Sequence, residues 1–120
     1  MIVRKYISKK DTIATIKKFF GNAVEDTPTE MIPEGEAYIL KYVDPLLKRN
    51  KALNKMIKDL PTSVFKGHIS RDEALTTVFS FYQSEIDDTM DPKEQVILTK
   101  EWKGLNKAIE RMPVKEKEIR

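Results

Sequence analysis

The sequence contains no cysteine, and its 120 residues include only one histidine, one tryptophan and four glycines. Without cysteine the chain can form neither disulfides nor a thiolate metal site, which fits an intracellular setting. No apolar run approaches the ~20 residues that a membrane-spanning helix needs. Residues 1–7 are too short for the apolar part of a secretory signal. We therefore expect a cytoplasmic protein that has no membrane partner.

Catalytic motifs are also missing. The sequence has no glycine-rich phosphate loop, nucleophile elbow or histidine pair, so we assign the lone His68 an incidental structural role. The acidic pairs Glu25–Asp26 and Asp87–Asp88 lack the alternating ligands and central glycine of a calcium loop. Because a threonine follows each pair, we expect them to shape turns. The sequence predicts no enzyme, no metal site and no cofactor.

Composition favours one small globular unit. Hydrophobic residues make up 40% of the chain and charged residues 34%, enough for both a core and a solvated surface. Residues 1–61 hold 12 Lys and Arg against 8 Asp and Glu, whereas residues 62–120 hold 10 against 11. A polyanion would therefore contact the first half more favourably than the second.

Two pairs of segments indicate an internal repeat. Residues 52–61 and 104–113 share five of ten residues, and residues 7–27 and 69–89 share six of 21. Two copies are too few for a solenoid, so we predict two pseudo-symmetric halves that share one core as an internal dimer. The predicted organisation is a basic first repeat at 1–61, a linker at 62–68, a near-neutral second repeat at 69–113 and a charged, frayed tail at 114–120.

The fold class that we predict is mainly α with short β-strands. Ser8 and Ser70 occupy capping positions, Gly21–Asn22 is typical of a helix end, and Asp91–Pro92 is typical of a helix start. Apolar residues at helical spacing predict a further helix over 48–60. The residues that we expect to anchor the core are Phe19, Phe81, Trp102, Leu105 and Ile109.

Several segments permit two interpretations. Residues 2–7 alternate apolar and basic side chains, which is typical of a short strand or an extended arm. Residues 23–35 form either a loop or one short helix. Residues 36–49 form either a hairpin around Asp44–Pro45 or a helix that ends at Pro45. Residues 96–99 form either a strand or the start of the last helix.

Basic residues in the first half are the candidate functional residues. Four of the lysines on the predicted helix 48–60 recur at steps of three and four residues and would line one side of it. Such a row can neutralise phosphates, although it can also be a solvated helix face. The candidate nucleic-acid-binding residues are Lys9, Lys10, Lys17, Lys18, Lys48, Arg49, Lys51, Lys55 and Lys58.

Residues 46–57 and 96–109 each run from apolar residues through basic ones into a helix. This pattern resembles the winged helix-turn-helix of small excisionases and MerR-type regulators. In size and two-half plan the chain also resembles duplicated members of that family among the DNA-binding accessory proteins of Gram-positive conjugative transfer. The resemblance implies two helix-turn-helix units, a second helix over residues 23–34 and a general DNA-binding role on the basic residues of the first half.

The sequence is compatible with two functions. The first is a non-enzymatic protein of a mobile element that binds double-stranded DNA as a regulator or transfer factor, with one monomer reading both halves of a site. The second is a helical interaction module, such as a phage-type inhibitor, that docks on a host protein through its second half. Steep salt dependence of binding would favour the first function, and salt-insensitive binding to a protein would favour the second.

Overall fold

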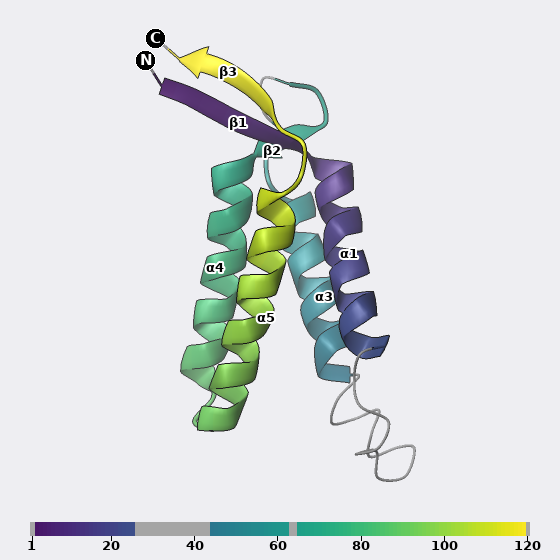
Figure 1. Ribbon diagram of the computed structural model, residues 1–120, viewed down its shortest axis with the longest axis vertical. Coiled ribbons are helices and arrows are strands. Elements are labelled where there is room, and N and C mark those ends of the chain that lie inside the picture. Colours follow the sequence, from purple (N-terminus) through teal and green to yellow (C-terminus); the bar gives the residue numbers. More distant parts are fainter. Residues whose placement is uncertain (1, 26–43, 63–64, 120) are drawn as a thin grey trace.

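The computed structural model describes residues 2–25, 44–62 and 65–119. The described helices are α1 (Lys9–Glu25), α3 (Asp44–Lys58), α4 (Arg71–Asp88) and α5 (Pro92–Glu110), and the strands are β1 (Ile2–Ser8), β2 (His68–Ser70) and β3 (Lys115–Ile119). Figure 1 shows the helices side by side, with the sheet across one end of the bundle. The predicted class, mainly α with short strands, is confirmed.

The small sheet joins the two ends of the described chain. Its order is β2-β1-β3, and both pairings are antiparallel. Of the two alternatives for residues 2–7, a short strand or an extended arm, the structure has the strand, β1. The predicted frayed tail is wrong, because residues 115–119 form β3. Lysine and glutamate alternate in β3, so no apolar pattern marks it as a strand. It is held by pairing with β1, which is more than a hundred residues away in sequence.

Side-chain caps define three helix starts as predicted. The Ser8 hydroxyl accepts the backbone N–H of Asp11 at 3.2 Å, and the Ser70 hydroxyl accepts that of Glu73 at 3.4 Å. Asp91 accepts the backbone N–H of Lys93 at 2.9 Å and is followed by proline in the first turn of α5. These contacts satisfy backbone donors that have no partner within the helix.

The structure corrects two helix boundaries and decides one segment that the sequence left open. Helix α1 continues through Gly21–Asn22 to Glu25, because glycine only weakens a helix interior and does not end it. Pro45 lies in the first turn of α3 and begins that helix, so residues 46–49 are helical and do not form a strand. Residues 96–99 are also helical, within α5. The alternatives for residues 26–43 lie outside the described part of the chain.

The helices are arranged so that α3 and α5 lie at opposite corners of the bundle. Helix α1 contacts both α3 and α5, and α4 contacts the same two helices. Within each sequential pair, α1 with α3 and α4 with α5, the chains run antiparallel (Figure 1). A helix-turn-helix instead joins its helices at about 90–120°. Most of the segment expected to supply its second helix lies outside the described residues, so this part of the resemblance stays a prediction.

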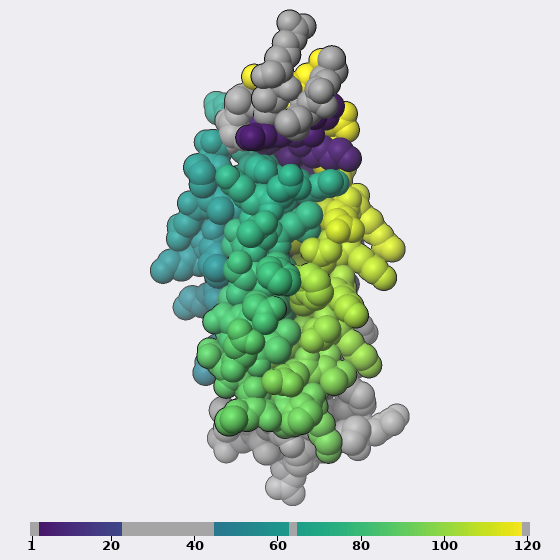
Figure 2. Space-filling model, turned by 90° about the vertical axis from the view of Figure 1, so that its left-hand side faces the viewer, coloured from purple at the N-terminus to yellow at the C-terminus, as the bar shows by residue number. Residues whose placement is uncertain are grey.

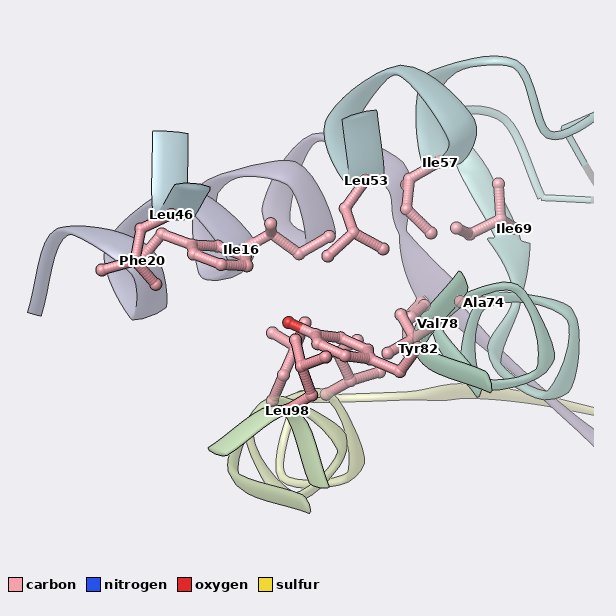
Figure 3. Packing of buried hydrophobic residues seen from close by; sticks show 13 residues of the cluster. Ile16, Phe20, Leu46, Leu53, Ile57, Ile69, Ala74, Val78, Tyr82 and Leu98 are labelled. Carbon is pink, nitrogen blue, oxygen red and sulfur yellow. The ribbon is translucent and has the colours of Figure 1, made fainter. Parts of the chain in front are cut away.

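One hydrophobic core runs between all of these helices, as Figure 3 shows. Leu105 and Ile109 are fully buried in it. Phe19, Phe81 and Trp102 are only partly buried against its edge, whereas the neighbouring Phe20 and Tyr82 are fully buried. A helical face is about 100° wide, and adjacent aromatic residues compete for its centre. Sequence periodicity does not decide which of the two adjacent residues is buried.

The internal repeat stays a prediction. Among the described elements, each half begins with a strand followed by helices, and β3 is added at the end of the second half. Ile7 and Ile69, which are equivalent at the 62-residue offset, face each other directly between β1 and β2, and both are fully buried. The predicted linker at 62–68 includes the first residue of β2. Just before that strand Gly67 has φ 71°, a conformation that glycine adopts without strain.

Candidate nucleic-acid interface

The outward face of α3 carries a row of lysines. Leu46, Leu53 and Ile57 bury the inner face of this helix. Lys48, Lys51, Lys55 and Lys58 follow at steps of three or four residues on the opposite side, and all four are exposed. We call these four lysines the α3 stripe. Among the described residues none of them forms an ion pair. No ion pair within the described part of the chain neutralises these charges, so they can meet an external anion.

The four lysines of α1 have different surroundings. Lys10, Lys17 and Lys18 are exposed. Lys9 is only half-buried, and its ammonium group donates hydrogen bonds to the backbone carbonyls of Lys58, at 2.9 Å, and of Leu60. It thus satisfies carbonyls at the C-terminus of α3, where a positive charge also complements the helix dipole. Lys9 is an internal cap and is not part of the exposed basic surface.

Arg49 is also removed from the predicted interface. Its guanidinium group makes a bidentate ion pair with Glu101 of α5, with Nε at 2.7 Å from Oε2 and the second nitrogen at 2.9 Å from Oε1. The side chains of Arg49 and Glu101 are only 15% and 7% exposed. Tyr82 of α4 donates its hydroxyl to the same carboxylate at 2.6 Å. This buried cluster links three helices, and it leaves Arg49 with its charge already neutralised.

Burial and charge shift the pKa values in this cluster. Burial opposes the charge of Arg49, but the hydrogen bond and negative charge of Glu101 outweigh it, so the pKa of Arg49 is raised. Burial also raises the pKa of Tyr82 well above its ordinary value, and the charge of Glu101 adds to the effect. The cluster therefore consists of a cation, an anion and a neutral phenol that donates its proton.

Sequence reasoning missed a second row of lysines. Lys100, Lys103 and Lys107 are exposed on α5, and they lie opposite the buried Leu98, Leu105 and Ile109 of the same helix. We call them the α5 stripe. An offset of 52 residues maps Lys48, Lys51 and Lys55 onto them. This is the offset of the repeated segment 52–61, so extending that alignment toward the N-terminus would have found the α5 stripe.

The difference in charge between the halves lies in their first helices. Helix α4 exposes several acidic residues. At the 62-residue offset, its uncharged Phe79 and Ser80 correspond to two lysines of α1, Lys17 and Lys18. The exposed acidic residues of α4 are Asp72, Glu73, Asp87 and Asp88. Helices α3 and α5 are alike in carrying a lysine stripe. Division of the sequence into two halves therefore hides the positive charge of α5.

An apolar hollow lies between α4 and α5. The rings of Phe79 and Trp102 meet edge to face with centroids 5.6 Å apart, and Phe79 is 48% exposed. The hollow has a volume of about 150 Å³. It is lined by Phe79, Tyr82, Gln83, Ile86, Thr99 and Trp102. Val96 and Ile97, on the same helix as Trp102, are more than half exposed.

Other classes of site find little support in the described part of the chain. His68 begins β2, with Nδ1 at 2.9 Å from the carbonyl of Lys66 and its ring near Phe65. Within residues 2–25, 44–62 and 65–119 no three His, Cys, Asp or Glu side chains gather as metal ligands. None of the helices described combines the length and apolarity that crossing a membrane requires.

Comparisons of the chain with protein-family models, with curated proteins and with solved structures found no match. The charges, exposure and contacts of this chain are therefore what indicates its function.

Proposed function

We propose that this protein is a non-enzymatic double-stranded DNA-binding protein that contacts phosphates through the α3 stripe. The observation that carries the proposal is the row of four exposed lysines on one helix face, with no acidic partner among the described residues. Isolated surface lysines are common, but a solvated helix face usually mixes lysine with glutamate at the same spacing. From Lys48 to Lys58 the outward face of α3 carries only lysines, and the nearest acidic residues at this spacing, Asp44 and Asp59, stand at its two ends.

The dimensions of the stripe suit a DNA backbone. Lys48 and Lys58 are ten residues apart, which is about 15 Å along a helix. Phosphates follow one another at about 3.4 Å of rise per strand, so the stripe spans about four of them. Lys10, Lys17 and Lys18 on the neighbouring α1 extend the positive field of this side. Contacts of this kind bind DNA without reading its sequence.

The test is equilibrium binding to a short DNA duplex at several salt concentrations between about 50 and about 200 mM. We expect the wild-type affinity to fall steeply with salt. The variant Lys51→Gln, Lys55→Gln should bind more weakly to every sequence, and the slope of log affinity against log salt should flatten by about two.

The matched control replaces two exposed lysines outside both stripes, Lys66→Gln with Lys115→Gln. It changes the net charge by the same amount and should leave the salt slope nearly unchanged. Absence of wild-type binding at the lowest salt would refute DNA binding. An equal loss in the control and the stripe variant would refute the assignment to α3.

The apolar hollow favours a second candidate function, docking on a partner protein. Exposed aromatic residues beside a concave apolar surface are typical of protein interfaces. Phe79→Asp should abolish such docking, and Lys51→Gln should leave it intact. Binding to a purified partner that is insensitive to salt and lost in Phe79→Asp would establish this function in place of DNA binding.

A further inference from the structure

The α3 and α5 stripes face away from each other. The two helices occupy opposite corners of the bundle, and in each helix the lysines lie opposite the buried residues. Figure 2 shows side chains of α3 along the left flank of the molecule and those of α5 along the right flank, with α4 between them. The molecule therefore carries the two stripes on opposite sides of a narrow body, with α4 between them on one side and α1 between them on the other.

We propose that one molecule bridges two DNA duplexes, one on each stripe. This inference rests on the DNA-binding function proposed above and extends it from one contact surface to two. The two surfaces repeat the same arrangement, because Lys100, Lys103 and Lys107 have the spacing of Lys48, Lys51 and Lys55. A second surface of the same chemistry takes a ligand of the same class.

A single duplex cannot serve both stripes. A helix with its side chains is about 10–12 Å wide, so a bundle two helices across separates the outward faces by roughly 20 Å. To contact both faces, one duplex would have to turn back around that body. DNA has a persistence length of about 150 base pairs, so a bend of that sharpness is far too costly for a few lysine contacts. Two duplexes reach the two stripes without bending.

On one side of the molecule, the surface between the two stripes is acidic, which keeps DNA bound at one stripe away from the other. Helix α4 lies there and exposes Asp72, Glu73, Asp87 and Asp88. These carboxylates repel phosphates, so a duplex on either stripe is kept from spreading across α4. DNA that is bound at α3 and DNA that is bound at α5 thus remain apart.

The α5 stripe is the weaker of the two. At the 52-residue offset Glu110 stands in the place of Lys58, so α5 has three lysines where α3 has four. The neighbouring α1 adds exposed lysines beside α3 and also contacts α5, whereas α4 adds acidic residues beside both. We therefore expect the first duplex to bind at α3 and the second to bind at α5 with lower affinity.

The experiment is a capture assay with the full chain. One duplex is fixed to beads, a second, fluorescent duplex is free in solution, and the protein is added at about 50 mM salt. Two triple variants are compared with wild type. The α3 variant combines Lys48→Gln, Lys51→Gln and Lys55→Gln, and the α5 variant combines Lys100→Gln, Lys103→Gln and Lys107→Gln. The matched control removes Lys66, Lys115 and Lys117 in the same way. Direct binding to one duplex is measured in parallel for every protein.

Wild type and control should retain the fluorescent duplex on the beads. Each stripe variant should still bind a single duplex but should capture about tenfold less of the second one, since one surface has lost its phosphate contacts. If wild type binds no duplex at all, the proposed DNA-binding function fails. If wild type binds one duplex and captures no second one, only the bridging inference fails.

Self-association would also produce bridging, through the α3 stripes of two copies. In that case the α5 variant would capture as much of the second duplex as wild type does. That result would overturn the inference, whereas loss of capture in the α5 variant at unchanged single-duplex affinity would support it.

Discussion

Arg49 and Lys51 show how differently two basic residues of one helix can be used. Arg49 points toward α5 and is neutralised by Glu101, while Lys51 is exposed and has no described ion pair. The sequence predicts that both are basic and helical. It does not reveal Glu101 as a partner, because the two residues are 52 positions apart. The separation of internally paired from exposed charge is therefore a property of the folded chain.

Replacement of Arg49 should lower stability, whereas replacement of Lys51 should weaken DNA binding. Arg49→Gln should lower the free energy of unfolding by about 2 to 4 kcal/mol, because it leaves the buried carboxylate of Glu101 without its cation. Lys51→Gln should change stability by less than about 0.5 kcal/mol and should weaken DNA binding. Urea unfolding together with the DNA titration gives both values. Equal stability of the two variants would contradict the role of Arg49.

Because the phenol of Tyr82 is buried, we expect the free energy of unfolding to depend on pH in the alkaline range. Its pKa is raised in the folded state, whereas in the unfolded chain it ionises near pH 10. Above about pH 10 the unfolded state therefore holds fewer protons than the folded state, and the free energy of unfolding falls as pH rises. Tyr82→Phe should weaken this fall. Urea unfolding of both proteins between about pH 9 and pH 11 measures it. Equal slopes would contradict a buried, neutral phenol at this position.

At the scale of elements, capping residues placed the starts of α1, α4 and α5, whereas α3, which has no such signal at residue 48, begins earlier than predicted. Serine and aspartate caps act through neighbouring residues, so Ser8, Ser70 and Asp91 could be recognised in the sequence. The end of α1 was misplaced because glycine permits a helix end without requiring one. Strand β3 was missed because nothing local distinguishes it from a charged tail. Its partner strand lies at the other end of the chain.

Two glycines inside helices should respond oppositely to larger residues. Around a Cβ placed at Gly21 no described atom lies within 4 Å, whereas a Cβ at Gly104 of α5 would be 3.0 Å from the ring of Phe19 of α1. Gly21→Ala should stabilise the protein by about 0.5 to 1 kcal/mol. Gly104→Leu should destabilise it by about 1 to 3 kcal/mol, because α1 and α5 must move apart. Thermal unfolding measures both, and stabilisation by Gly104→Leu would contradict the close packing of α1 against α5.

At the scale of the whole molecule, the two halves share one core. Helix α1 of the first half contacts α5 of the second, and α3 contacts α4. The fully buried residues come from both halves, among them Leu53 and Ile57 from α3 and Leu105 and Ile109 from α5. A unit of about 60 residues buries a smaller fraction of its surface than the whole chain does and would be only marginally stable alone. The molecule should therefore fold as one cooperative unit.

Cooperative folding predicts coincident unfolding transitions. The fluorescence of Trp102 reports on the α4 and α5 side of the bundle, and far-ultraviolet circular dichroism reports on all of the helices. In urea both signals should change with the same midpoint and the same slope. Separate midpoints would show that the halves unfold independently, contrary to the shared core.

The sequence by itself determined the helical class, the caps and the lysine row on α3. Each of these depends on residues a few positions apart, and their periodicity is visible in the chain. The tertiary structure alone decided that β3 pairs with β1, that Arg49 and Lys9 are engaged internally and that the α3 and α5 stripes point in opposite directions. These features depend on contacts between residues about fifty or more positions apart, where side-chain packing, and not local preference, selects the partner.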